Sequence, residues 1–300
     1  MRHNFGRRPL LLGAVLGLLL NGTALLAQAG SEDVDIPSWK TLKGYYDYDA
    51  NLPQEVETKD LSTASEYKQH IVLRLKGREP IPALFIRPNE PKSYPCILLL
   101  HGYTSKKEDM VSRFANDLLS AGFAVLALDA PMHGERKPKD TPVTFNSFPT
   151  IIKQGIVDYR CILDYLKTRR DVRFKDIGLV GYSMGGMMGT ILTAVDSRIK
   201  SSVVCVNGDV GFMMLKTATK SMQNELIPIC NSLYAGKITP RPILFLNGKR
   251  DNIVPRIATM KTYDAAGEGK EIVWYDAGHQ LPPEANEKAA LWLKEKFRLR

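Results

Sequence analysis

The chain has 300 residues, of which 44% are hydrophobic and 24% charged, and it carries a formal net charge of +9 at pH 7. These proportions are typical of a folded globular protein, so they exclude collagen, a coiled coil and intrinsic disorder as descriptions of the whole chain. The length suits one large α/β domain or two small ones, and four cysteines are too few for a disulfide-stabilised scaffold.

The first 29 residues predict a secretory signal peptide. Arg2, Arg7 and Arg8 precede an apolar run from Leu10 to Leu20, and the small residues of Ala27–Ala29 follow at the place where a signal peptide is cleaved. The run is shorter than the roughly 20 residues that cross a bilayer, so we expect no membrane span after cleavage. An uncleaved N-terminal anchor is the alternative. The sequence therefore predicts an exported protein, periplasmic or secreted.

The positive charge does not indicate a nucleic-acid partner. Residues 1–29 hold three arginines and no acidic residue, so their removal lowers the net charge from +9 to +6. The remaining basic residues form no stripe with interleaved aromatic residues. Examples are Lys106 with Lys107, Arg136 with Lys137, Arg169 with Arg170, and Arg298 with Arg300. We therefore expect these residues on solvated surface and no nucleic acid bound to them.

After a polar lead segment, residues 30–65, the chain alternates strands with helices. Continuous apolar runs such as Cys96–Leu100 are typical of strands buried on both faces, and apolar residues at helical spacing mark Ile152–Lys167. Eight strands are predicted, at Tyr67–Leu75, Pro82–Arg87, Cys96–Leu100, Phe123–Leu128, Ile177–Val180, Ser202–Val206, Ile243–Leu246 and Glu271–Tyr275. Residues 66–300 are thus predicted to form one α/β domain with a doubly wound, mainly parallel eight-stranded sheet that starts antiparallel.

Two connections, residues 130–149 and 208–240, are longer than the others. Both follow the carboxyl ends of predicted strands, where open α/β sheets bind their ligands, and long connections are usually functional or disordered. Because Met213–Ile229 has a helical pattern, residues 208–240 are predicted to form a small lid. An ordinary crossover helix with an irregular loop is the equal alternative.

The segment Gly181–Gly186, with the sequence Gly-Tyr-Ser-Met-Gly-Gly, connects a predicted buried strand to an apolar helix. A serine raised on a sharp strand-to-helix turn needs glycines two residues before and after it, so that the backbones approach without a Cβ clash. The helix N-terminus then directs N–H groups toward developing negative charge. We therefore predict that Ser183 is a nucleophile; a glycine-rich packing turn with an incidental serine is the alternative.

A serine nucleophile needs a base and a carboxylate that orients the base. His279 is the only histidine that follows Ser183 in the chain, so it is the predicted base. Asp251 comes shortly after the predicted strand Ile243–Leu246 and is the predicted partner of that histidine. Asp276 is the rival carboxylate, for which we expect a structural role.

The backbone N–H groups of Tyr103 and Met184 are predicted to form an oxyanion hole. His101 and His133 are expected to fix loops by hydrogen bonds rather than to catalyse. Neither has a His, Asp or Glu partner at the spacing of zinc ligands, and no phosphate-binding glycine motif follows a strand. We therefore predict no metal and no cofactor.

Four motifs in this order resemble those of the α/β-hydrolase superfamily, and the resemblance covers residues 66–298. The motifs are His-Gly-Tyr-Thr at 101–104, Gly-Tyr-Ser-Met-Gly-Gly at 181–186, Gly-Lys-Arg-Asp-Asn-Ile-Val-Pro at 248–255 and Ala-Gly-His at 277–279. Residues 129–136 are similar to those of bacterial dienelactone-hydrolase-like and prolyl-oligopeptidase-like esterases. The resemblance implies Ser183 as nucleophile, His279 as base and Asp251 as its partner. Dienelactone hydrolases themselves use a cysteine nucleophile, so we do not expect their substrate here.

We therefore expect an exported serine esterase that cleaves small-molecule carboxylic esters with small or aromatic acyl groups. A peptidase or an acyltransferase with the same three residues is the first alternative, and the shape of residues 208–240 would decide between them. A non-catalytic binding protein on a hydrolase scaffold is the second, against which the intact order of serine, aspartate and histidine argues. The sequence does not predict an oligomeric state.

Two expectations concern other residues. The loop 135–139 is expected near the mouth of the site, where its basic residues would favour anionic substrates; they are Arg136, Lys137 and Lys139. Three cysteines fall in predicted core elements and are expected to be buried thiols, namely Cys96, Cys161 and Cys205. Cys230 lies in the predicted lid, and its pairing with another cysteine stays open.

Overall fold

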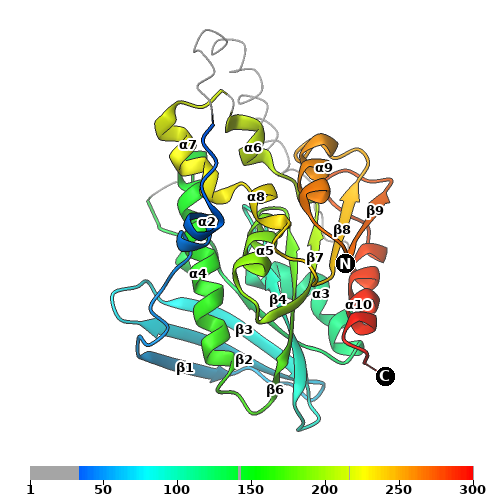
Figure 1. Cartoon of the computed structure of the whole chain (residues 1–300). Helices are drawn as coiled ribbons and strands as arrows, with labels where there is room; N and C mark the ends of the chain where they lie inside the picture. Colours follow the sequence, from blue (N-terminus) through cyan, green and yellow to red (C-terminus); the bar gives the residue numbers. More distant parts are fainter. Residues whose placement is uncertain (1–33, 141–142, 216, 300) are drawn as a thin grey trace.

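One nine-stranded sheet runs through the residues that the structure, a computed structural model, describes: 34–140, 143–215 and 217–299. The strand order is β1-β2-β3-β5-β4-β6-β7-β8-β9 (Figure 1). The last six strands in this order are mutually parallel, whereas β1, β2, β3 and β5 pair antiparallel. The strands are β1 (Gln54–Asp60), β2 (Glu66–Leu75), β3 (Ile81–Pro88), β4 (Tyr94–Leu100), β5 (Ala124–Leu128), β6 (Val172–Tyr182), β7 (Ile199–Cys205), β8 (Ile243–Gly248) and β9 (Lys270–Tyr275).

The predicted fold class is confirmed, but the sheet has one strand more than the eight predicted. The additional strand, β1, lies inside the segment 30–65 that was predicted to be a lead. Six of its seven residues are exposed, so it lacks the apolar alternation by which a half-buried strand is recognised. Pairing with β2 holds it instead, and an ion pair of 2.7 Å between Glu57 and Arg74 crosses the two strands.

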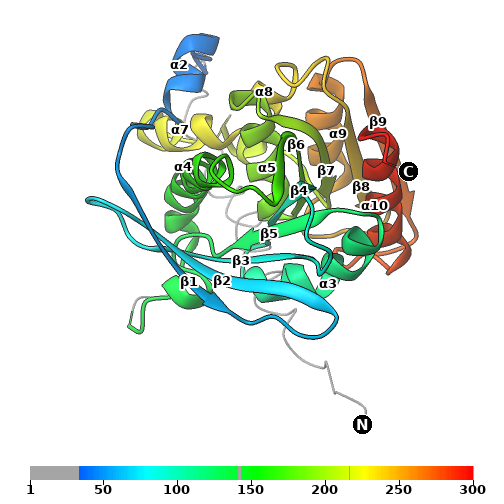
Figure 2. The ribbon, with the colours of Figure 1, turned by 90° about the horizontal axis from the view of Figure 1, so that it is seen from below.

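Helices cover both faces of the sheet, which explains the continuous apolar strands. All seven residues of β4 are buried. Cys96, Leu98 and Leu100 pack with α4 (Phe148–Leu166) and α5 (Met184–Val195). Ile97 and Leu99 pack on the other face with α3 (Lys107–Ser120) and α10 (Glu284–Lys296), and Figure 2 shows these two layers. Each fully buried leucine or isoleucine contributes about 1.5–3 kcal/mol by leaving water.

The connection between β7 and β8 contains several short helices rather than one long helix. They are α6 (Val210–Leu215), α7 (Lys220–Leu226), the 3₁₀ turn η3 (Ile227–Ile229) and α8 (Ser232–Ala235). Thr219 begins α7 by accepting a hydrogen bond from the backbone N–H of Met222, and Pro228 lies in the first turn of η3. The helical pattern of Met213–Ile229 is therefore divided by a cap and a proline. That this insertion forms a lid remains a prediction.

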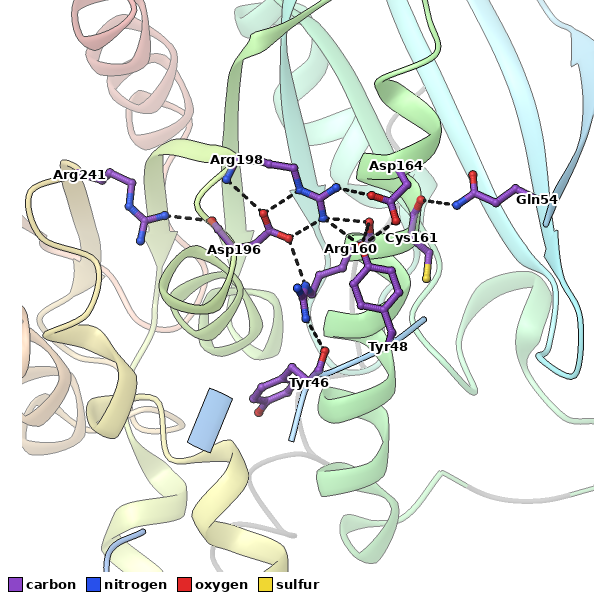
Figure 3. A network of polar contacts seen from close by, with 9 residues as sticks. All are labelled: Tyr46, Tyr48, Gln54, Arg160, Cys161, Asp164, Asp196, Arg198 and Arg241. Atoms are coloured by element: carbon purple, nitrogen blue, oxygen red, sulfur yellow. Dashed lines mark hydrogen bonds and ion pairs between the residues drawn. The ribbon is translucent and has the colours of Figure 1, made fainter. Parts of the chain in front are cut away.

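The lead segment packs against this insertion. It contains α2 (Trp39–Gly44), and the rings of Trp39 and Tyr46 lie 6.0 and 5.8 Å from the ring of Tyr234 in α8. Further along the lead segment, Tyr48 joins a network of polar contacts with Arg160 and other residues of α4 and of the turn before β7 (Figure 3). Its other ionic members are Asp164, Asp196 and Arg198.

The remaining elements are α9 (Arg256–Ala265) and the 3₁₀ turns η1 (Gly134–Arg136) and η2 (Phe145–Ser147). The predicted signal peptide, residues 1–29, lies outside the described residues. Within residues 34–140, 143–215 and 217–299, no helix is both long and apolar enough to cross a membrane.

Candidate active site

Ser183 lies on a sharp turn between β6 and α5. Its φ of 54° and ψ of −115° form a backbone conformation that a non-glycine residue rarely adopts and that costs energy. The turn is held because the N–H of Ser183 donates to the carbonyl of Cys205 at 2.9 Å. A Cβ on Gly181 would lie 2.2 Å from the carbonyl oxygen of Gly185, so only glycine fits there. The same applies to Gly185, where a Cβ would lie 2.0 Å from the carbonyl oxygen of Leu100.

The structure brings Ser183, His279 and Asp251 together from three different loops. His279 Nε2 is 2.9 Å from Ser183 Oγ, and His279 Nδ1 is 2.8 Å from Asp251 Oδ2. With the ring proton on Nδ1, His279 donates to the carboxylate and its Nε2 accepts the serine proton. The side chains of His279 and Asp251 are 11% and 4% exposed, so water competes little for these hydrogen bonds.

The carboxylate of Asp251 is itself fixed. Its Oδ1 accepts hydrogen bonds from the backbone N–H groups of Ile253 and Val254, at 2.9 and 3.0 Å. The rival carboxylate, Asp276, instead forms an exposed ion pair of 2.8 Å with Arg250. Of the two predicted candidates, only Asp251 contacts the histidine.

The two predicted oxyanion donors are the backbone N–H groups of Tyr103 and Met184, which follow Gly102 and Ser183 in the chain. Met184 is the first residue of α5, where helix geometry leaves N–H groups unpaired. Tyr103 follows Gly102, where a Cβ would lie 3.5 Å from the Cβ of Ser183. Both predicted oxyanion donors therefore lie in the immediate surroundings of the serine.

His101 and His133 form hydrogen bonds with the backbone of the neighbouring loops. His101 Nε2 accepts from the N–H of Ala130 at 2.9 Å, and its Nδ1 is 2.7 Å from the carbonyl oxygen of Gly102. Burial lowers the pKa of His101 to about 4, so the ring stays neutral. His133 Nδ1 lies 2.8 Å from the carbonyl oxygen of Pro131, and burial lowers its pKa as well.

The expectation that Arg136 faces an anionic substrate is wrong. Its side chain is 3% exposed and pairs at 2.7 Å with both Asp158 and Glu79. The guanidinium also donates to the carbonyl of Asp129 at 3.1 Å. Its N–H groups therefore form contacts that stabilise the fold. Lys107 is buried nearby and bonds the Asp129 carboxylate at 2.7 Å. Burial alone would lower the pKa of Lys107, but its carboxylate partners hold it above the usual value.

All four cysteines are free and buried. Burial raises the pKa of Cys96 and of Cys205 to about 12, and it raises the pKa of Cys230 well above its usual value. Cys230 donates to the carbonyl of Leu226 at 3.2 Å and forms no disulfide. In the described ranges, no group of three or more His, Cys, Asp or Glu side chains is arranged to hold a metal ion.

Two further residues beside the site, Tyr182 and Arg113, were not predicted from the sequence. The hydroxyl of Tyr182 donates to the carbonyl of His279 at 2.8 Å, and Arg113 donates to the carbonyl of Leu281 at 2.7 Å. The position of Tyr182 next to Ser183 was visible, but the direction of its side chain was not.

Comparisons with known proteins show the family to which the chain belongs. The model of the dienelactone hydrolase family matches residues 81–291. The putative hydrolase YtaP of Bacillus subtilis is 30% identical over 230 residues, which are 68% of this chain and 76% of the relative. Esterase YjfP of Escherichia coli is 25% identical and covers 75% of this chain and 99% of its own length.

Two solved structures have the same fold. A cold-adapted esterase from an Arctic intertidal metagenomic library superposes with a TM-score of 0.65 at 23% identity, covering 81% of this chain and 99% of its own. Acetyl xylan esterase 1 of Thermoanaerobacterium superposes with a TM-score of 0.72 at 16% identity, covering 97% and 99%. At these identities the likeness shows the fold alone.

Proposed function

Because the chain belongs to the dienelactone hydrolase family and has the hydrolase function of that family, we propose that it is a serine esterase of small-molecule carboxylic esters. The observation that carries the proposal is the pair of hydrogen bonds from Ser183 through His279 to Asp251, at 2.9 and 2.8 Å. Nucleophile, base and orienting carboxylate are thereby within reach of one another, which is the arrangement that acyl transfer requires.

The environment of the thiols supports serine, rather than cysteine, as the nucleophile. A thiol attacks as thiolate, and burial raises the pKa of Cys96, Cys205 and Cys230, which suppresses that form. At the turn between β6 and α5, the side chain that His279 contacts is the hydroxyl of Ser183.

In the proposed acylation step, His279 Nε2 takes the proton of Ser183 while Oγ forms a bond to the ester carbonyl carbon. The carbonyl π electrons move to oxygen, and the N–H groups of Tyr103 and Met184 donate to that oxyanion. Collapse of the tetrahedral intermediate breaks the bond to the alkoxy oxygen, which leaves as the alcohol with the proton from His279. Asp251 stabilises the transient imidazolium charge.

Deacylation repeats the same chemistry with water. His279 removes a proton from a water molecule that attacks the acyl carbon of the acyl-Ser183 ester, and the same two N–H groups hold the second oxyanion. The bond to Oγ then breaks, Oγ regains a proton from His279, and the carboxylic acid leaves. The enzyme returns to its starting state without a cofactor.

An aromatic surface supports small or aromatic acyl groups as substrates. The rings of Tyr103 and Phe148 meet edge to face with centroids 5.8 Å apart, and the ring of His133 lies 5.6 Å from that of Tyr103. Tyr103 directly follows Gly102, where a Cβ would lie 3.5 Å from the Cβ of Ser183, and we propose that these rings line the site beside the nucleophile. A flat or short acyl chain packs on such rings without displacing them.

The test is hydrolysis of p-nitrophenyl acetate by the wild type and by Ser183→Ala. We expect kcat/KM to fall by about 10³-fold or more, because the residual rate of such variants comes from the oxyanion donors and binding alone. Ser65→Ala, at an exposed serine before β2, is the control and should match the wild type. A fluorophosphonate probe should label the wild type and not Ser183→Ala. Equal hydrolysis by both would refute the serine mechanism.

We also propose export, which rests on the pattern of residues 1–29. Expression of the full chain in a bacterium followed by fractionation should place activity outside the cytoplasm. N-terminal sequencing of that fraction should begin at Gly30. A cytoplasmic protein that retains Met1 would contradict the proposal.

A further inference from the structure

The loop that carries His279 has no helix or strand of its own between the end of β9 and the start of α10. Before His279, the loop is attached to the end of β8, because the N–H of Arg250 donates to the carbonyl of Ala277 at 2.9 Å. Asp251 holds the imidazole ring. The hydrogen bond from the ring to Asp251 does not by itself fix the backbone of His279. The chain after His279 therefore needs an attachment of its own.

Tyr182 provides that attachment. Its hydroxyl donates to the carbonyl of His279 at 2.8 Å and accepts from the N–H of Leu281 at 2.9 Å. Burial raises the pKa of Tyr182 to about 12, so the phenol keeps its proton and remains a donor at neutral pH. Because Tyr182 directly precedes Ser183, this hydroxyl connects the nucleophile turn to the base loop.

Arg113 of α3 completes the contact from the other side. Its guanidinium carbon lies 4.4 Å from the centre of the Tyr182 ring, a cation–π distance. The same guanidinium donates to the carbonyl of Leu281 at 2.7 Å and to Asn286 Oδ1 at 3.1 Å, and at 3.3 Å to Gln280 Oε1. The planar fork thus binds the loop and the start of α10 at once, which a lysine could not do.

We propose that Tyr182 and Arg113 are positioning residues that hold the His279 backbone at the distance from Ser183 that proton transfer needs. This inference rests on the proposed serine mechanism. Neither side chain touches the reacting atoms; both act through residues 279–286, which are the end of the loop and the first turn of α10. Displacement of a reacting group by about 1 Å costs on the order of 100-fold in rate, so the effect belongs in kcat.

Tyr182→Phe tests the proposal because it keeps the ring and removes only the hydroxyl. We expect kcat on p-nitrophenyl acetate to fall by about 10-fold or more, with KM changed by less than about twofold. Labelling by a fluorophosphonate probe should slow by a similar factor. The matched control is Tyr94→Phe, at the first residue of β4. It removes a hydroxyl that donates to the carbonyl of Glu90 at 3.0 Å. It should keep the wild-type kcat.

Arg113→Met decides the question if Tyr182→Phe does not fold. It should lower kcat without raising KM, and Arg113→Lys should restore only part of the loss. Wild-type kcat in folded Tyr182→Phe and Arg113→Met, with Ser183→Ala inactive, would overturn the positioning role and leave the serine mechanism standing. Activity in Ser183→Ala would instead refute the mechanism itself. The two failures are therefore distinguishable.

Discussion

The nucleophile turn and the contact between lead segment and insertion are built in opposite ways. Around Ser183 the backbone segments of β4, β6 and α5 approach so closely that a Cβ on Gly181 or Gly185 would overlap a carbonyl group. At the other contact, large side chains fill the space: Trp39, Tyr46 and Tyr234 meet edge to face. The nucleophile turn has no room for an added methyl group. The aromatic contact is instead held by large side chains, which can be shortened one group at a time.

This difference predicts which variants lose activity and which lose only stability. A change in the nucleophile turn alters the geometry of Ser183 directly. A change in the aromatic contact weakens the attachment of the insertion but leaves the three hydrogen-bonded side chains where they are. The variants below test this division.

Gly185→Ala should have the largest effect. The new Cβ would lie 2.0 Å from the carbonyl oxygen of Leu100, so the strand or the helix must move. We expect a loss of about 3 kcal/mol or more in the free energy of unfolding and a loss of most esterase activity, measured by urea unfolding and by kcat/KM. Gly44→Ala is the control, since its Cβ would lie 3.8 Å from Asp47 Oδ2, an ordinary contact. Near-normal activity in Gly185→Ala would show that the turn can relax.

Tyr234→Ala should lower stability by a similar amount but spare the chemistry. Tyr234 is fully buried, and removing a buried aromatic ring costs about 3–5 kcal/mol. In the folded fraction, the rate of fluorophosphonate labelling should stay close to that of the wild type. Slow labelling of folded Tyr234→Ala would mean that the aromatic contact shapes the site after all.

Tyr46→Phe should cost about 1 kcal/mol, the usual contribution of one buried hydrogen bond. Its hydroxyl donates to the carbonyl of Pro228 in η3. Urea unfolding measures the change, and kcat should not move. Tyr45→Phe, at a tyrosine that is 39% exposed, is the adjacent control and should leave the midpoint unchanged. Equal midpoints for the two variants would exclude a role for the Tyr46 hydroxyl in holding the insertion.

Asp196→Asn should change the pH dependence of stability. Burial would raise the pKa of Asp196, but hydrogen bonds and charge from Arg198 and Arg160 hold it below its ordinary value of 3.8. A depressed pKa adds stability that is complete above the unfolded-state value and is lost as pH falls through the lower folded-state value. The wild-type Tm should therefore drop more steeply below about pH 4 than that of Asp196→Asn. The exposed Asp264→Asn should keep the wild-type slope.

The predictions from sequence succeeded where the backbone dictates residue type. Glycines are forced by close approach at Gly181 and Gly185, and strands covered on both faces must be apolar. The parallel sheet and the neighbourhood of Ser183 were therefore visible in the sequence. Asp251 was preferred to Asp276 because Asp276 lies only three residues from His279 in the chain, and it is Asp251 that pairs with the histidine.

The sequence could not show contacts that depend on the direction of side chains remote in the chain. Arg136 was expected on solvated surface because the basic residues are dispersed along the sequence, yet Glu79 and Asp158 reach it from distant segments. Strand β1 was missed because backbone pairing, rather than burial, holds it. The hydroxyl of Tyr182 bonds a residue that lies 97 positions further along the chain. A pattern of apolar residues along the sequence cannot predict such a contact.

Strand β1 has a consequence for solubility. It lies at the edge of the sheet and pairs only with β2 among the residues the structure describes, so its outer row of N–H and C=O groups can template a strand from another molecule. Charges occupy much of this exposed edge: Glu55, Glu57, Lys59 and Asp60. Extending the sheet into a second copy would crowd these charged side chains against those of the copy, and charged edge strands oppose edge-to-edge aggregation. The strand that carries the least apolar surface thereby protects the sheet from growing.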